Sequence, residues 1–123
     1  MKESDRHRTG SLGEKRACEY LREKGYIIIE TNYRFMRGEI DIIASTDREL
    51  VFIEVKSRTS SHFGFPEESV DTRKRKQLFK VAEAWIHERK MTGSPVRFDV
   101  ISILHPAKPE EQISHIEGAF WRL

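Results

Sequence analysis

The chain has 123 residues, of which 37% are hydrophobic and 34% charged, and its 22 basic and 20 acidic residues give a formal net charge of +2. This length suits one domain and leaves too little chain for a second hydrophobic core. The longest apolar runs fall far short of the roughly 20 residues that a membrane-spanning helix needs, so we expect no membrane partner. A net charge so close to zero neither requires nor excludes nucleic acid as a partner.

Residues 1–10 are polar and show no apolar periodicity. We therefore expect a flexible N-terminal tail, followed by a single domain over residues 11–123. The same stretch lacks the apolar segment of a secretory signal, which predicts a cytoplasmic protein. The chain has one cysteine, Cys18, which cannot form an internal disulfide bond and is expected to be a buried hydrophobic residue.

Hydrophobic spacing predicts two helices and four or five strands. Helices are expected over residues 12–24, before Gly25, and over about residues 70–90. Stretches rich in apolar and β-branched residues predict strands at 26–31, 38–44, 50–57, 96–104 and 113–116. The polar residues 45–49 predict a hairpin, and residues 58–69 predict a surface loop. This order of elements predicts an α/β fold with a mixed sheet flanked by helices.

Charged residues interrupt both strands of the predicted hairpin. Glu54 and Lys56 are two positions apart, so they point to the same face of their strand, and Glu39 and Asp41 share a face in the same way. A symmetric turn with a loop of two or four residues would place Asp41 opposite Glu54. The same register would place Glu39 opposite Lys56, whereas a loop of odd length would break both matches.

Two interpretations fit these charges. They could form ion pairs on a solvated sheet face, where each pair contributes only about 0–1 kcal/mol. The apolar character of both strands favours a partly buried cluster instead, which is costly to fold and typical of functional sites. Two carboxylates can hold Mg²⁺, which polarises a phosphoryl oxygen and generates hydroxide at neutral pH. Lys56 would then position the attacking water or neutralise charge on the phosphate.

The spacing of these residues also resembles a known signature. Asp41, followed after twelve residues by Glu54-Val55-Lys56, resembles the Asp…(Asp/Glu)-x-Lys pattern of the PD-(D/E)XK nuclease superfamily. Its setting is more specific, because Gly13-Glu14 opens a helix, Phe63-Gly64 lies in the loop and a basic helix follows. Over about residues 12–104 the chain resembles the YraN-like family of bacterial proteins, which is similar to archaeal Holliday-junction resolvases.

The resemblance implies a restriction-endonuclease-like, three-layer core with a mixed sheet of four or five strands. It implies that Asp41, Glu54 and the carbonyl oxygen of Val55 bind Mg²⁺ or Mn²⁺, that Lys56 is catalytic, and that Glu14 is the helix-borne acidic residue of resolvase-like members. The implied activity is an endonuclease acting on structured or branched DNA. The implied assembly is a homodimer that pairs two active sites.

Glu14 has a second interpretation. The sequence Ser11-Leu12-Gly13-Glu14 fits a capping box, in which Ser11 caps the helix and Glu14 reaches back to the Ser11 amide. Its position on the apolar face, with Ala17 and Leu21, favours the active site instead.

Basic residues are concentrated between Thr72 and Ala82, where five occur without an acid. Such a run can be a solvated helical turn, but cations near a helix N-terminus oppose the helix dipole, and contact with phosphate supplies a reason for them. The predicted nucleic-acid-binding residues are Arg34, Arg37, Arg58, Arg73, Lys74, Arg75 and Lys76. The small net charge would then be the sum of an acidic metal site, which includes Glu39, and a basic rim.

Three functions remain open on the sequence. The first is a metal-dependent endonuclease, the second a nucleic-acid-binding module that keeps the fold with little or no catalysis, and the third a scaffold whose acidic cluster is structural. The presence of Asp41, Glu54 and Lys56 together favours the nuclease. Asp99, which interrupts another apolar strand, is expected to be a structural carboxylate whose hydrogen bonds are satisfied.

Overall fold

The structure is a computed structural model that describes residues 3–59 and 72–120, with side chains described from residue 11 onward. One sheet contains all five strands in the order β1-β2-β3-β4-β5. β3 and β4 are parallel, and the other neighbouring pairs are antiparallel. The elements are α1 (Glu3–Glu23), β1 (Ile27–Phe35), β2 (Gly38–Ser45), β3 (Leu50–Arg58), α2 (Thr72–Glu88), β4 (Val96–Leu104) and β5 (Gln112–Phe120). The predicted mixed α/β sheet is confirmed, with the fifth strand present.

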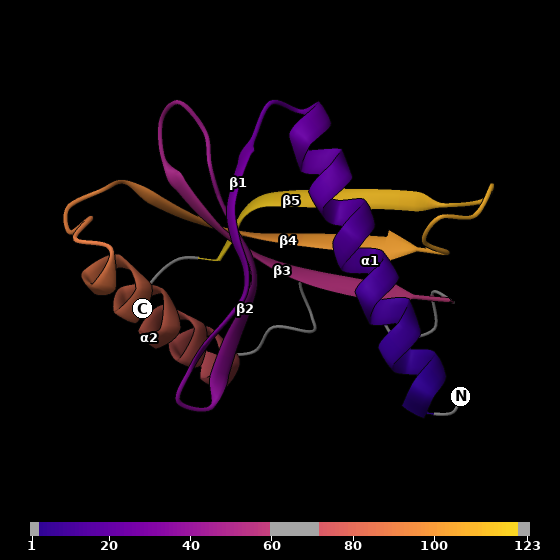
Figure 1. Ribbon diagram of the computed structural model, residues 1–123, viewed down its shortest axis with the longest axis horizontal. Coiled ribbons are helices and arrows are strands. Elements are labelled where there is room, and N and C mark those ends of the chain that lie inside the picture. Colours follow the sequence, from indigo (N-terminus) through magenta and orange to yellow (C-terminus); the bar gives the residue numbers. More distant parts are fainter. Residues whose placement is uncertain (1–2, 60–71, 121–123) are drawn as a thin grey trace.

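The two helices cover opposite faces of the sheet, which gives the three layers that the sequence predicted (Figure 1). Beneath α2, Trp85 packs with Phe52 and Phe98, and beneath α1, Leu21 belongs to the same buried cluster as Ile101. Strands that are covered on both faces must be apolar on both, which explains why β3 and β4 lack simple polar alternation. The parallel pairing of β3 with β4 requires a crossover connection, which contains α2.

α1 is longer than the sequence predicted. The helix begins at Glu3, not near Leu12, so residues 3–10 are helical where we expected no secondary structure. Once a helix has nucleated, each further residue adds a hydrogen bond at little cost, and an extension needs no apolar stripe of its own. The capping-box interpretation of Ser11 and Glu14 is therefore wrong, because both residues lie inside the helix.

The β2–β3 hairpin has the register expected of a symmetric turn, with pairs from Ser45 and Leu50 to Ile42 and Ile53. The strand pairing ends there, one position short of Asp41, so the expected opposition of Asp41 with Glu54 and of Glu39 with Lys56 lies beyond the paired segment. In Figure 1, β1 and β2 run across the direction of β3, β4 and β5. The candidate functional residues lie where β2 leaves β3.

Two glycines allow the helices to approach this region closely. A Cβ atom at Gly13 of α1 would overlap the side chain of Ser57 in β3, and one at Gly38 of β2 would overlap Val81 of α2. Any other residue at these two positions would require the helix or its neighbour to move. Gly13 immediately precedes Glu14 and Gly38 immediately precedes Glu39, so each close contact lies next to an acidic residue considered above.

No helix in the described part of the chain combines the length and the apolarity needed to cross a membrane. Most of the predicted surface loop, including Phe63-Gly64, falls on residues 60–71 and lies outside the described residues.

Candidate active site

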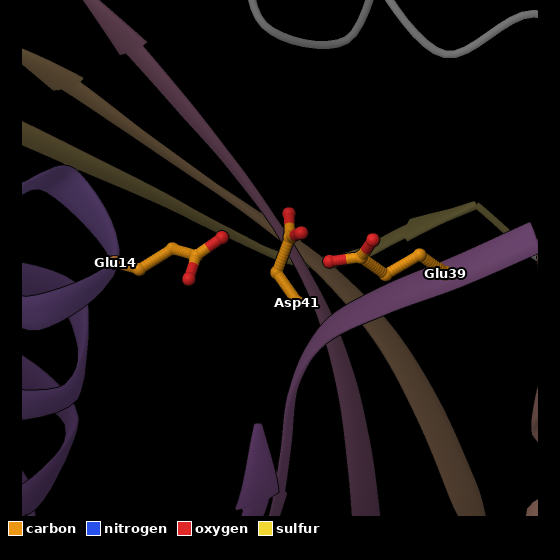
Figure 2. Close-up of side chains that lie close together, drawn as sticks. All are labelled: Glu14, Glu39 and Asp41. Carbon is orange, nitrogen blue, oxygen red and sulfur yellow. The ribbon is translucent and has the colours of Figure 1, made fainter. Parts of the chain in front are cut away.

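Three carboxylates meet at the start of the divergence between β2 and β3. Glu14 extends from α1, and Glu39 and Asp41 extend from β2 (Figure 2). One oxygen from each of the three lies within 4.8 Å of the others. The sequence predicted that Glu14 and Asp41 belong to one site, and the fold brings them together across two elements.

Asp41 occupies the centre of this arrangement. Its Oδ2 accepts a hydrogen bond of 2.7 Å from the backbone N–H of Val55, which takes the place of a strand-to-strand hydrogen bond. Burial, followed by the negative charge of Glu54, raises the pKa of Asp41 to about 7, although the Val55 hydrogen bond opposes this rise. Glu14 and Glu39 raise it further. The groups that favour the protonated carboxyl therefore outweigh those that favour its ionised form.

Glu54 is buried in β3 and faces α2. Two lysines contact it, Lys56 of β3 and Lys74 of α2. Lys74 Nζ lies 2.8 Å and Lys56 Nζ 3.3 Å from Oε1 of Glu54. Burial and the neighbouring Lys74 lower the pKa of Lys56. Burial is the largest influence on Lys74 and acts in the same direction, but the contacts with Glu54 and Lys56 and the negative charge of Asp41 together outweigh it and raise the pKa of that lysine. Glu54, Lys56 and Lys74 therefore form one group of interacting charges beside Asp41.

The donor set fits a hard divalent cation. Mg²⁺ and Mn²⁺ prefer carboxylate and carbonyl oxygens, and the group of Glu14, Glu39 and Asp41 supplies three carboxylates at close range. Among the described residues, both lysine contacts of Glu54 fall on Oε1, so a cation would reach Glu54 through Oε2. A bound cation would also favour the ionised form of Asp41.

The predicted nucleic-acid-binding residues fall into different environments. Arg34 Nε lies 3.0 Å from Glu39 Oε2, and Arg75 lies over the ring of Phe120 at 5.4 Å from its centre. Arg58 is half-buried at the end of β3, and Lys74 belongs to the buried group around Glu54. Arg37, Arg73 and Lys76 are exposed and line one pocket.

Lys74 is the residue whose place the sequence indicated least well. The basic run predicts that Lys74 contacts phosphate like its neighbours, whereas the fold places its Nζ against the buried carboxylate of Glu54. No pattern within the basic run distinguishes it, because its contact depends on how α2 crosses β3. Glu39, by contrast, was indicated by its shared face with Asp41.

Asp99 has the structural role that the sequence predicted. It is fully buried in β4, and its two oxygens accept hydrogen bonds of 2.9 Å from Arg97, while Gly118 N–H donates to Oδ1 at 3.0 Å. His115 Nε2 lies 2.7 Å from Oδ2. Burial alone would raise the pKa of Asp99, but these hydrogen bonds outweigh it and hold that pKa below its ordinary value.

Comparison with known proteins assigns this α/β chain to a family. The family model described as Uncharacterised protein family UPF0102 matches residues 13–103. A UPF0102 protein of Clostridioides difficile (strain 630) is 47% identical over 111 residues, which cover 90% of this chain and 95% of that protein. One from Caldanaerobacter subterraneus subsp. tengcongensis is 43% identical over 122 residues, which cover 98% of this chain and 100% of the relative. The chain belongs to the UPF0102 family, so the predicted membership of the YraN-like family is confirmed.

Proposed function

We propose that the protein is a divalent-metal-dependent endonuclease that hydrolyses phosphodiester bonds in DNA. The observation that carries this proposal is the position of Asp41, a half-buried carboxylate beside two acidic side chains and a Glu54–Lys56 pair. A cluster of acids in a half-buried position is costly to fold, and such an arrangement is typical of sites that bind a cation.

Each residue has a role in this proposal. Asp41 and Glu54 would hold Mg²⁺ or Mn²⁺ with the carbonyl oxygen of Val55, and the metal would polarise a phosphoryl oxygen and lower the pKa of a bound water. Glu14 would hold a further ligand or water from the α1 side. Lys56, whose pKa is lowered, would orient the attacking water and hold or release its proton at Nζ.

Structured or branched DNA is the substrate that we propose, cleaved by two paired copies of the chain. The support for both statements is the resemblance of the motifs to resolvases. Exposed cations on β1, in the β1–β2 turn and on α2 support binding to a phosphate backbone of whatever shape.

The decisive experiment incubates the protein with four-way, forked and linear DNA in Mg²⁺, Mn²⁺ or EDTA. We expect cleavage that requires the metal and falls by at least about a hundredfold in Asp41→Asn, Glu54→Gln and Lys56→Ala, since each removes a charge that acts on the transition state. Glu110→Gln and Lys108→Ala serve as matched controls, because both residues are exposed and lie outside the cluster. Metal-independent cleavage, or equal cleavage by the three variants, would exclude this function.

One observation favours a second candidate, a nucleic-acid-binding module without catalysis. Lys56 and Lys74 both contact Glu54, so an internal ammonium group already neutralises a proposed metal ligand. Calorimetric titration of Mn²⁺ into the wild type and Lys74→Met separates the candidates. The nuclease proposal expects the wild type to bind Mn²⁺, whereas a binding module expects DNA affinity without metal affinity.

A further inference from the structure

A pocket with an apolar floor and a cationic rim lies beside the candidate active site. The tip of the β1–β2 hairpin forms one wall and the first turns of α2 form the other, enclosing about 370 Å³. Phe35 and Met36 supply apolar surface, with 39% and 87% of their areas exposed. Isolated exposed apolar residues are ordinary, but an aromatic ring and a thioether at the tip of one hairpin form a surface on which a flat ligand can stack.

The rim of this pocket is strongly basic. Arg37, Arg73, Lys76 and Lys80 line it, and the described lining contains no acidic residue. Within the described part of the chain, the ion pairs include none of these four side chains. Four cations around an apolar floor complement a ligand that combines negative charge with a flat, apolar ring. A nucleotide has both properties.

The pocket and the carboxylate cluster share two chain segments. Arg37 and Gly38 line the pocket, and Glu39, the next residue of β2, belongs to the carboxylate cluster. Arg73 lines the pocket, and its neighbour Lys74 contacts Glu54. The pocket and the candidate site are therefore adjacent along both segments.

We propose that this pocket binds an unpaired nucleotide of the DNA strand that enters the active site, with the base on Phe35 and Met36 and the phosphates on the basic rim. This inference rests on the proposed function and narrows it to DNA with a single-stranded segment beside the cleavage point. Paired bases cannot occupy the pocket, because a duplex keeps its bases stacked on one another.

The test measures binding in EDTA, where cleavage cannot interfere. Fluorescence anisotropy compares a duplex with the same duplex carrying single-stranded DNA arms. We expect the wild type to prefer the armed DNA and Phe35→Ala to lose about five- to tenfold in affinity for it, with less than a twofold change for the duplex. Phe35→Trp keeps a flat ring and should retain the preference. Ile27→Ala, which removes an exposed apolar side chain elsewhere on β1, is the matched control.

A second arm tests the basic rim. Replacing Arg73 and Lys76 by Gln should weaken binding of armed DNA and lower the slope of log affinity against log salt by about 1.4, or about 0.7 per lost contact with a single strand. Lys90→Gln with Lys108→Gln, both exposed and outside the pocket lining, is the charge-matched control.

Several results would overturn the proposal. They are an equal loss on both DNAs in Phe35→Ala, no loss at all, a stronger preference for RNA arms, or a dimer that Phe35→Ala converts to a monomer in sedimentation experiments. Binding and cleavage also separate the two proposals. If the preference for armed DNA depends on Phe35 but no metal-dependent cleavage occurs, the pocket proposal stands and the nuclease proposal is excluded. If metal-dependent cleavage occurs without that preference, the nuclease proposal stands and the pocket proposal is excluded.

Discussion

Asp41 interrupts the hairpin at the point where the site forms. Its carboxylate accepts the Val55 N–H that a strand carbonyl would otherwise bind, so the backbone group stays satisfied while β2 turns away. The same contact holds the carboxyl group where burial and its acidic neighbours raise its pKa to about 7. One residue thus opens the sheet and carries the charge that a cation would neutralise.

Replacing Asp41 by Asn should stabilise the metal-free protein. The folded-state pKa lies above the ordinary value of 3.8, so the folded chain binds this proton more tightly than the unfolded chain. The stability from this group is present below pH 4 and is lost as pH rises towards 7. Asn stays neutral and its Oδ1 can still accept the Val55 N–H. In EDTA at pH 8 we expect a gain of roughly 1–3 kcal/mol in the free energy of unfolding, which shrinks towards pH 4.

Urea denaturation across this pH range, with EDTA or with Mg²⁺, measures the effect. Mg²⁺ should stabilise the wild type and leave Asp41→Asn nearly unchanged, because only the wild type retains the full set of ligands. Asp47→Asn, in the exposed β2–β3 turn, should show neither behaviour. A variant less stable than the wild type in EDTA at pH 8 would contradict the raised pKa.

At the level of elements, α1 reaches the site because Gly13 has no side chain. The helix approaches β3 so closely that a Cβ atom at Gly13 would overlap Ser57, with only 2.7 Å to the Ser57 Cβ. Alanine is preferred to glycine inside a helix by about 1 kcal/mol, so helix propensity alone predicts that Gly13→Ala is stabilising. The close contact predicts the opposite sign, with a loss of about 1–3 kcal/mol and a weaker Mg²⁺ response as Glu14 moves.

Thermal and urea denaturation of four variants distinguishes these effects. The double variant Gly13→Ala/Ser57→Gly removes the overlapping atoms and should recover most of the stability, relative to Ser57→Gly alone. Ser11→Ala is the control. It should leave the stability unchanged because Ser11 lies inside the helix, whereas the loss of a helix cap would cost about 1 kcal/mol. An increase in stability for Gly13→Ala alone would contradict the close approach.

Local patterns predicted the elements well because periodicity and turn residues determine them. The polar residues 45–49 predicted the β2–β3 hairpin, and its register is the one that the sequence predicts if the turn is symmetric. The start of α1 at Glu3 was missed because a helical extension leaves no apolar pattern to detect. Element boundaries thus follow from sequence only where each element has a buried face.

The site was only partly predictable for a related reason. Glu39 and Asp41 share a face through strand geometry, which sequence reveals directly. The meeting of Glu14 with them depends on how α1 crosses the sheet, and only its position on the apolar face of the helix and the family motif indicated it. The contact of Lys74 with Glu54 depends on the path of α2, and the surrounding basic residues concealed it.

At the scale of the whole molecule, a buried polar network joins segments that are distant in sequence. Arg97 of β4 bonds to Asp99, to Glu49 in the β2–β3 turn and to the hydroxyl of Tyr26, which precedes β1. His115 of β5 contacts the same Asp99. The candidate active site uses none of these groups, so the network contributes to the stability of the fold and not to the proposed chemistry.

Replacing Asp99 by Asn should therefore destabilise the whole sheet in a pH-dependent way. The folded-state pKa lies below the ordinary value of 3.8, so the unfolded chain binds the proton more readily. The stability from Asp99 is present above about pH 4 and is lost as pH falls through the lower folded value. At pH 7 we expect a loss of roughly 2–4 kcal/mol, because an amide has one acceptor oxygen for the donors that surround it. Urea denaturation between pH 3 and pH 7 should show the difference from the wild type narrowing as the pH falls.

The same variant tests whether the fold and the candidate site are separable. If the network acts on stability alone, Asp99→Asn should bind Mn²⁺ with the wild-type affinity at temperatures where it remains folded, because no metal ligand that we propose touches Asp99. Asp41→Asn should show the reverse, with weak Mn²⁺ binding in a chain that is at least as stable as the wild type. A loss of Mn²⁺ affinity in folded Asp99→Asn would mean that the network holds the sheet in the shape that the carboxylate cluster requires, and stability and metal binding would then be coupled through the sheet.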